Sequence, residues 1–259
     1  PHLNIVGECW TRPASAVAYW QTGVKNYNGF DSHLPSVMDF PVEEAIRQAL
    51  EKDGKQWGEG LTRVYDAVAM DYLYGDVNNI LLMLGNHDMD RIADVVMDQD
   101  PRRVKIAYTL LATMRGIPQV FYGDEYAMKS ADRRMGHSTL RMPLPLGEAV
   151  TAEMQDMFDY QSRLFQWRKG EKVIHTGRTM HFMSRDNTYA YFRYNDEEAV
   201  FVFVNASDAD RTIPTAHYAE ILGKYKPVGV DVISGKTYDL SQKDITIEPL
   251  SSIVVKLEK

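Results

Sequence analysis

The chain has 259 residues, 44% of them hydrophobic, so it carries enough apolar side chains for one large buried core or two smaller ones. Its formal net charge of −7 argues against a nucleic-acid partner, because phosphate binding needs clustered Lys and Arg. A single cysteine, Cys9, excludes an internal disulfide and a thiolate metal cluster, and no apolar run approaches the roughly 20 residues that span a bilayer.

Residues 1–172 alternate short apolar runs with long helical patterns. We predict strands at residues 3–6, 36–40, 79–84 and 117–122. We predict helices at residues 41–50, 61–73, 102–115 and 154–167. The third helix has the clearest limits, since Asp100 and Pro101 form an N-cap with Pro at the first position, and Gly116 ends the pattern. The strand–helix order, repeated four times, requires a parallel sheet with right-handed crossovers.

Four such units in this length fit half of an eightfold β/α barrel with enlarged loops at the carboxyl ends of its strands. In residues 173–259 the sequence pattern changes from alternating strands and helices to short strands separated by turn signals. These strands are predicted at residues 188–194, 199–205, 228–233 and 253–257. The fold class is therefore α/β, half of a (β/α)8 TIM barrel, followed by an all-β antiparallel sandwich domain. The sequence opens directly in strand-like residues, so we expect further chain upstream.

Two carboxylates come directly after predicted strands, which is where a barrel places its catalytic groups: Glu8 after the first strand and Asp88 after the third. Trp10 lies beside Glu8 and offers a flat apolar face to a sugar ring. Asn86 and His87 precede Asp88, so that one turn supplies an amide, an imidazole and a carboxylate to sugar hydroxyls.

Glycoside hydrolysis uses one protonated and one ionised carboxyl group, roughly 5 to 5.5 Å apart when configuration is retained. The residues alone assign Glu8 as the acid and Asp88 as the nucleophile, with Arg91 able to keep a nearby carboxylate ionised. A purely structural role is the alternative for each of these two carboxylates. Glu8 could pair with Arg12 or Arg91 as an ordinary strand-end carboxylate, and Asp88 could cap a helix that begins near residue 89.

Three ordered motifs support the functional interpretation: IVGECW at residues 5–10, LGNHD at 84–88 and GIPQVFYGDE at 116–125. Together they resemble the α-amylase superfamily of glycoside hydrolases, over the whole chain. Within it, the details are most similar to the neopullulanase and cyclomaltodextrinase group, including the periplasmic enzymes of bacterial starch-utilisation systems. GHSTLR at residues 136–141 resembles a loop whose Arg, in that group, reaches the non-reducing side of the cleavage point.

The resemblance corrects the assignment above. It implies that Glu8 is the general acid and base, and that Asp88 stabilises the transition state and holds sugar hydroxyls. The nucleophile in the family is another Asp on the preceding strand, in a motif that this sequence does not contain. The resemblance therefore implies that the chain is the C-terminal half of the barrel (strands 5–8) with the sandwich domain, and that the chain alone is inactive. The residues predicted to bind substrate are Trp10, Asn86, His87, Arg91 and Arg141. Asp132-Arg133-Arg134 is predicted to be a solvated loop.

The implied activity is retaining hydrolysis of α-1,4-glucosidic bonds in pullulan, cyclodextrins or maltooligosaccharides, in the periplasm. We expect no cofactor and no metal ligands here, although calcium is possible in the full-length enzyme. The expected partners are α-glucan oligosaccharides and either the missing N-terminal half of the barrel or a second copy, because half a parallel barrel exposes two hydrophobic edges. The alternative is a non-catalytic glucan-binding or assembly module of the same family.

Overall fold

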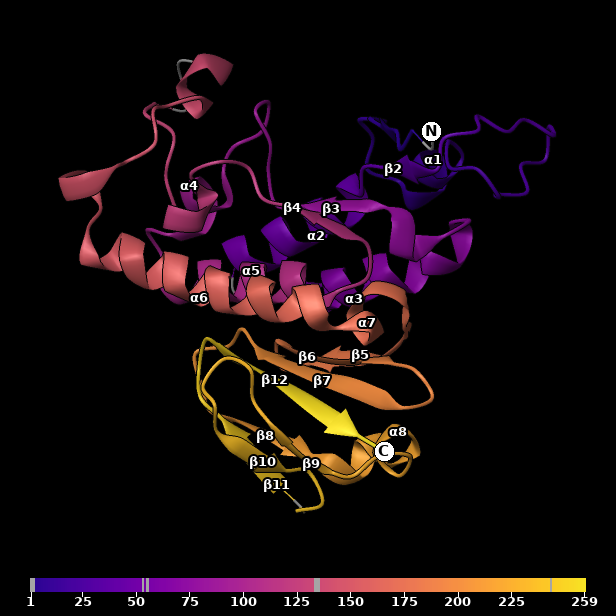
Figure 1. The fold of residues 1–259 in the computed structure, drawn as a ribbon, viewed down its shortest axis with the longest axis vertical. Helices are drawn as coiled ribbons and strands as arrows, with labels where there is room; N and C mark the ends of the chain where they lie inside the picture. Colours follow the sequence, from indigo (N-terminus) through magenta and orange to yellow (C-terminus); the bar gives the residue numbers. More distant parts are fainter. Residues whose placement is uncertain (1–2, 53, 55, 133–135, 243) are drawn as a thin grey trace.

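The computed structural model describes every residue except 1–2, 53, 55, 133–135 and 243. A layer of helices separates two β regions: short parallel strands lie on one side of it and the C-terminal sheets on the other (Figure 1). The predicted loop at Arg133 and Arg134 lies outside the described residues.

Four short strands make up the parallel region: β1 (Val6–Gly7), β2 (Ser36–Val37), β3 (Leu81–Met83) and β4 (Ile117–Gln119). β1 pairs with β2 and β3 pairs with β4, both in parallel. A parallel bridge between Met38 and Leu81, with the Asp39 N–H donating to the Leu81 carbonyl at 2.8 Å, joins β2 to β3. The order is therefore β1-β2-β3-β4, and all four carboxyl ends meet at one edge.

The strand predicted at residues 3–6 is wrong in extent and in burial. β1 begins only at Val6, and the side chains of Leu3 and Ile5 are 80% and 47% exposed. The physical reason is that β1 pairs on one side only, with β2, so the preceding residues have neither a second strand nor a covering helix within the described part of the chain. The other three strands predicted in this region are present but shorter.

The helices are α1 (Ala14–Ala18), α2 (Phe40–Glu51), α3 (Thr62–Ala69), α4 (Ile92–Val96), α5 (Pro101–Thr113), α6 (Ala152–Gly170), α7 (Lys172–Thr176) and α8 (Ala219–Leu222). Asp100 caps α5 as predicted, its side chain accepting from the N–H of Arg102. The predicted helix 61–73 is divided into α3 and a 3-10 turn at Met70–Leu73. No described helix is both long enough and apolar enough to cross a bilayer.

The C-terminal part contains one larger sheet and two strand pairs. Its strands are β5 (Arg178–Arg185), β6 (Thr188–Tyr194), β7 (Glu198–Asn205), β8 (Arg211–Pro214), β9 (Val228–Val230), β10 (Thr237–Asp239), β11 (Asp244–Ile247) and β12 (Ser251–Glu258). The antiparallel sheet has the order β12-β7-β6-β5, while β8 pairs with β11 and β9 with β10. Alternation along β6 sends Tyr189 and Tyr191 into the core against the helices, and Ala190 and Phe192 into a second core on the far side.

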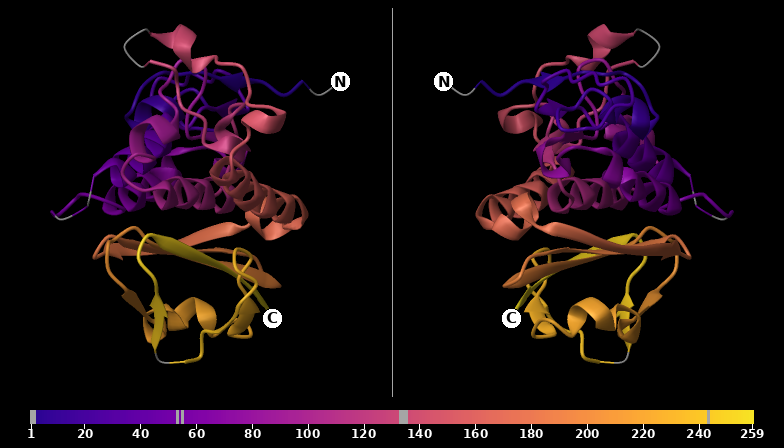
Figure 2. Two further views of the ribbon diagram at one scale, coloured as in Figure 1. Left: turned by 90° about the vertical axis from the view of Figure 1, so that its left-hand side faces the viewer. Right: turned by 90° about the vertical axis from the view of Figure 1, so that its right-hand side faces the viewer.

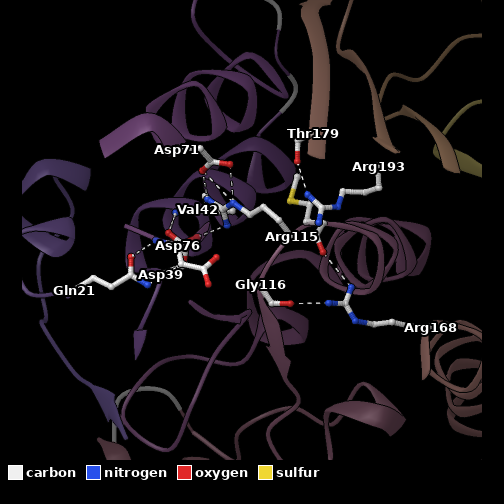
Figure 3. A network of polar contacts seen from close by, with 11 residues as sticks. Gln21, Asp39, Val42, Asp71, Asp76, Arg115, Gly116, Arg168, Thr179 and Arg193 are labelled. Carbon is white, nitrogen blue, oxygen red and sulfur yellow. Dashed lines mark hydrogen bonds and ion pairs between the residues drawn. The ribbon is translucent and has the colours of Figure 1, made fainter. Parts of the chain in front are cut away.

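Buried arginines hold these layers together (Figure 3). Arg115 donates to Asp39 at 2.5 Å and, through Nε, to both carboxylate oxygens of Asp71. Burial raises the pKa of Asp39, and the neighbouring Arg115 opposes that rise. Arg168 of α6 donates to the carbonyl of Gly116 at 2.6 Å, just before β4. The start of β4 is thereby fixed to both α2 and α6.

Arg193 of β6 likewise joins the helical layer to the C-terminal sheet. It donates to Thr179 at 2.6 Å, to the side chain of Asn78 at 2.7 Å and to the carbonyl of Ile174 at 2.9 Å. Burial lowers its pKa to about 10. These bonds tie the segment before β3 to the C-terminal sheet, so the edge that carries the predicted site rests on a fixed base.

Candidate active site

Glu8 and Asp88 leave the parallel sheet at the same edge. Glu8 follows β1 directly, and Asp88 follows β3 after a turn of four residues. Glu8 is exposed and makes no hydrogen bond or ion pair with the residues that the structure describes. The ordinary pairings considered above are not formed, because Arg12 contacts Glu44 at 3.5 Å and Arg91 contacts Asp124 at 2.6 Å. The carboxylate of Glu8 is therefore open to the edge.

Three basic side chains converge on Asp88. Its Oδ1 lies 3.1 Å from Nδ1 of His137 and 3.1 Å from the guanidinium of Arg141, and its Oδ2 lies 3.2 Å from Nε2 of His87. The hydrogen bond from His137 and the nearby charges of His87 and Arg141 lower the pKa of Asp88. Helix capping is excluded as the role of Asp88, since the next helix, α4, begins at Ile92. The arrangement keeps the carboxylate ionised.

Asn86 shapes the turn that presents Asp88. Its side chain is buried, and its Oδ1 accepts from the backbone N–H of Asp88 at 2.8 Å. His87 points outward, with more than half of its side chain exposed. That Asn86 and His87 contact sugar hydroxyls stays a prediction. The exposed side chain of His87 is more accessible to a sugar than the buried side chain of Asn86.

The buried side chain of Arg91 holds together the loops that surround the site. It donates to Asp124 at 2.6 Å, to the carbonyl of Tyr122 at 2.8 Å and to the carbonyl of Leu140 at 2.8 Å, and its guanidinium lies 4.5 Å from the ring centre of Phe121. Its side chain is buried, so in this conformation it has no surface to offer a sugar, contrary to its predicted part in substrate binding. It instead links the ends of β3 and β4 to the segment that carries Arg141.

Asp124 is the buried acid in this pair. Burial raises its pKa to about 6, while the ion pair with Arg91 opposes that rise. Gln161 of α6 also donates to the carbonyl of Asp124, at 2.9 Å. This network fixes the loop after β4, which contains the acidic end of the GIPQVFYGDE motif.

Trp10 combines a packed face with an open one. Its ring centre lies 5.0 Å from that of Phe40, the first residue of α2, at an interplanar angle of 34°. More than half of the side chain stays exposed. Packing and sugar stacking are therefore compatible at this residue.

The sequence analysis did not select His137 as a site residue. The only signal was its place in the GHSTLR motif, four residues before Arg141, within one 3-10 turn (His137–Leu140). Its contact with Asp88 spans 49 residues of sequence, which no local pattern indicates. Among the described residues, no three His, Cys, Asp or Glu side chains gather closely enough to bind a metal ion.

Two family models match the chain. That of the α-amylase catalytic domain matches residues 1–211, and that of the cyclo-malto-dextrinase C-terminal domain matches residues 179–256. The first covers most of the chain, including Glu8, Asp88 and Arg141. The two ranges overlap in β5, β6 and β7, so the predicted boundary after residue 172 stays a prediction.

Curated relatives are glucan-active enzymes. A cyclomaltodextrin glucanotransferase of Geobacillus stearothermophilus is 25% identical over 203 residues, which are 73% of this chain and 26% of that protein. An α-amylase of Niallia circulans is 26% identical over 224 residues, which are 82% of this chain and 40% of that protein. The chain therefore spans less than half the length of either relative.

Solved structures share the fold at low identity. An Anoxybacillus α-amylase has a TM-score of 0.77 at 16% identity, covering 98% of this chain and 52% of that one. AmyP in complex with maltose has a TM-score of 0.78 at 18% identity, covering 98% of this chain and 55% of that one. With its motifs, its fold and the match of its first 211 residues to the catalytic-domain model, this chain belongs to the α-amylase family.

Proposed function

We propose that the protein to which this chain belongs hydrolyses α-1,4-glucosidic bonds with retention of configuration, with Glu8 as the general acid and base. The observation that carries the proposal is an electrostatic contrast at one edge. Asp88 is held ionised by His137, His87 and Arg141, whereas Glu8 has no partner within the described residues. Glu8 is thus free to exchange a proton with a substrate oxygen, while the ionised Asp88 can stabilise positive charge.

In the proposed reaction, Glu8 donates its proton to the leaving glycosidic oxygen while a carboxylate from outside this chain attacks the anomeric carbon. The bond to the leaving sugar breaks, and a glycosyl-enzyme ester forms. Glu8, now ionised, takes a proton from a water molecule. The oxygen of that water attacks the anomeric carbon and displaces the carboxylate from it, which regenerates both groups. Asp88 stabilises the positive charge that develops at the anomeric carbon, and this requires the ionised form that its neighbours favour.

Cyclodextrins, pullulan and maltooligosaccharides are the proposed substrates. The match of residues 179–256 to the cyclo-malto-dextrinase C-terminal domain supports this group, as does the maltose bound in the related AmyP structure. The glucanotransferase relatives raise a second candidate, in which a sugar hydroxyl replaces water as the acceptor. Product analysis separates the two, because a transferase makes longer oligosaccharides from maltotriose and a hydrolase makes only shorter ones.

The periplasm is the proposed location, because the neopullulanase enzymes that the sequence resembles act there. Fractionation of cells by osmotic shock, followed by detection of the chain with an antibody, checks this. Recovery in the cytoplasmic fraction contradicts it.

The chain joined to a segment that carries the nucleophile should hydrolyse a chromogenic maltooligosaccharide, and the chain alone should not. In the joined protein, Glu8→Gln removes the proton donor and should lower kcat by about 10²- to 10⁴-fold. Glu148→Gln, at an exposed glutamate of the loop before α6, is the control and should keep full activity.

Full activity of the Glu8→Gln protein would refute the catalytic assignment. The non-catalytic alternative predicts another result: no turnover by the joined protein, together with retention of the chain on starch.

A further inference from the structure

A groove of about 500 Å³ lies far from the predicted active edge, between the loop that joins α2 to α3 and the turn between β5 and β6. α2 starts at the carboxyl end of β2 and runs back along the sheet, so this loop emerges at the opposite end of the strands from Glu8 and Asp88. The loop lies on the flank of the helical layer, beside the C-terminal sheet (Figure 2). The volume falls within the roughly 300–1,000 Å³ typical of small-molecule sites.

Three large apolar or aromatic side chains contribute to the lining of the groove. Trp57 is completely exposed, and Met183 on the β5 side is 64% exposed. Tyr65 of α3 also lines the groove and is held by stacking on His181, at 4.7 Å between ring centres. An indole with an open face, next to a fixed tyrosine, is a surface on which the apolar face of a sugar ring can stack.

The remaining lining is polar and charged. Asp66, Arg185 and Asp186 are exposed in the groove, and neither aspartate forms an ion pair with the residues that the structure describes. Their carboxylates can accept hydrogen bonds from hydroxyl groups, and the guanidinium can donate. An apolar protein segment in the same place would desolvate these charges without pairing them. The combination suits a neutral ligand with many hydroxyl groups.

The two walls are fixed relative to each other. Oδ1 of Asn187 accepts from the N–H of Leu61 at 3.0 Å, and its Nδ2 donates to the carbonyl of Ala206 at 2.9 Å. Gly60 permits this contact, because it has a φ of 57° and a Cβ there would lie 2.2 Å from Oδ1 of Asn187. The groove therefore needs little rearrangement to bind, which lowers the entropic cost of binding.

We propose that this groove is a second, non-catalytic binding site for an α-glucan oligosaccharide. The ligand class rests on the proposed function, whereas the site itself rests on Trp57, Tyr65 and the two aspartates, which form no ion pair with the described residues. Such a site anchors the enzyme to a long glucan while the distant edge acts on another segment or chain.

The chain itself is the material for the test, since binding needs no turnover. Titration with maltoheptaose and retention on insoluble starch are measured for the wild type and for Trp57→Ala. We expect Trp57→Ala to weaken maltoheptaose binding by about tenfold, and Asp66→Asn to weaken it by about threefold. Tyr72→Ala, at a side chain that is 77% exposed outside the groove, is the matched control and should bind as the wild type does.

Equal binding by Trp57→Ala and the wild type overturns the inference, as does a lack of maltoheptaose binding by the wild type. An effect of Trp57→Ala on sedimentation, with glucan binding unchanged, assigns the groove to a protein partner and also overturns it. The proposed function is judged separately, by turnover of a short chromogenic substrate with and without Glu8→Gln. Trp57→Ala should leave that turnover unchanged.

Discussion

At the scale of single residues, the site depends on how Asp88 is surrounded. His137 and Arg141 reach it from one short 3-10 turn, and Arg91 fixes that turn from below through the carbonyl of Leu140. Basic groups beside both carboxylate oxygens lower the pKa of Asp88 and so favour its ionised form. A sugar hydroxyl that enters the site can exchange with one of these contacts, so the neighbours of Asp88 both tune its charge and hold its place.

Removing His137 should raise the pKa of Asp88 toward the ordinary range for aspartate, because the contact from His137 is the largest cause of the lowered pKa. The measurement is a pH titration of the Asp88 carboxyl carbon by NMR in wild type and His137→Ala. In the joined enzyme, the same change should move the acidic limb of the pH–rate profile upward.

His33→Ala is the control for this titration, since His33 lies beside Asp31 and not beside Asp88. An unchanged Asp88 titration in His137→Ala would show that Arg141 and His87 alone keep it ionised.

These residues also show the reach of sequence analysis. Glu8, His87 and Asp88 could be selected because each stands within a few residues of a predicted strand end, in a short motif. The part of Arg91 could not be predicted, because its partners lie 31 to 49 residues away and are set by the packing of loops. The charge of Arg91 suggested an exposed side chain. In the structure the side chain is buried, and its charge is compensated by Asp124 and by hydrogen bonds to two carbonyl groups.

At the scale of secondary structure, caps and periodicity located the four long helices, but not the short ones. α1, α4, α7 and α8 have four or five residues, too few to establish a helical period. β6 and β7 were predicted because most of their residues are apolar, as suits strands that are buried on both faces. β5 was missed because its exposed and polar positions break the alternation.

Glu43 gives α2 a dependence on pH. It is buried and bound to Arg47, yet burial raises its pKa to about 7. Between the ordinary pKa, near 4.5, and about 7, the folded chain binds more protons at Glu43 than the unfolded chain does, so stability falls as pH rises through this range. The loss is complete above about pH 7 and amounts to at most about 3 kcal/mol.

Glu43→Gln cannot ionise and should lack this loss. The free energy of unfolding of the variant, relative to the wild type, should therefore rise by about 1–3 kcal/mol between pH 5 and pH 8. Denaturant titrations at both pH values measure this difference. Glu51→Gln, at the exposed end of the same helix, should show no such gain, and an equal difference at both pH values for Glu43→Gln would contradict the argument.

At the scale of the whole molecule, the two predicted domains share a core. One hydrophobic cluster runs from Ile46 of α2 through Leu164 of α6 to Tyr191 of β6 and Val202 of β7. The sequence indicated a change of texture near residue 170, but not that the helices of the first part bury one face of the C-terminal sheet (Figure 1). A change in local sequence pattern shows where one kind of secondary structure gives way to another. It does not show that segments distant in the sequence pack against each other, as the helices and the C-terminal sheet do here.

The two outer edges of the parallel sheet provide a last prediction. Leu3 and Ile5 beside β1, and Ile117 and Tyr122 in and after β4, are all at least 39% exposed. Within the described part of the chain, each of the two edge strands pairs with another strand on one side only. We expect the chain alone to self-associate as its concentration rises, and to form a one-to-one complex with a segment that supplies the neighbouring strands. Sedimentation velocity measures both.

Charges on these edges should oppose association, because each buried lysine would lose its hydration. The double variant Leu3→Lys and Ile117→Lys should weaken self-association by about tenfold or more. Leu146→Lys, at an exposed leucine away from both edges, should leave it unchanged. A wild-type chain that stays monomeric at high concentration would contradict the prediction, since the exposed edges would then be stable in water without a second chain.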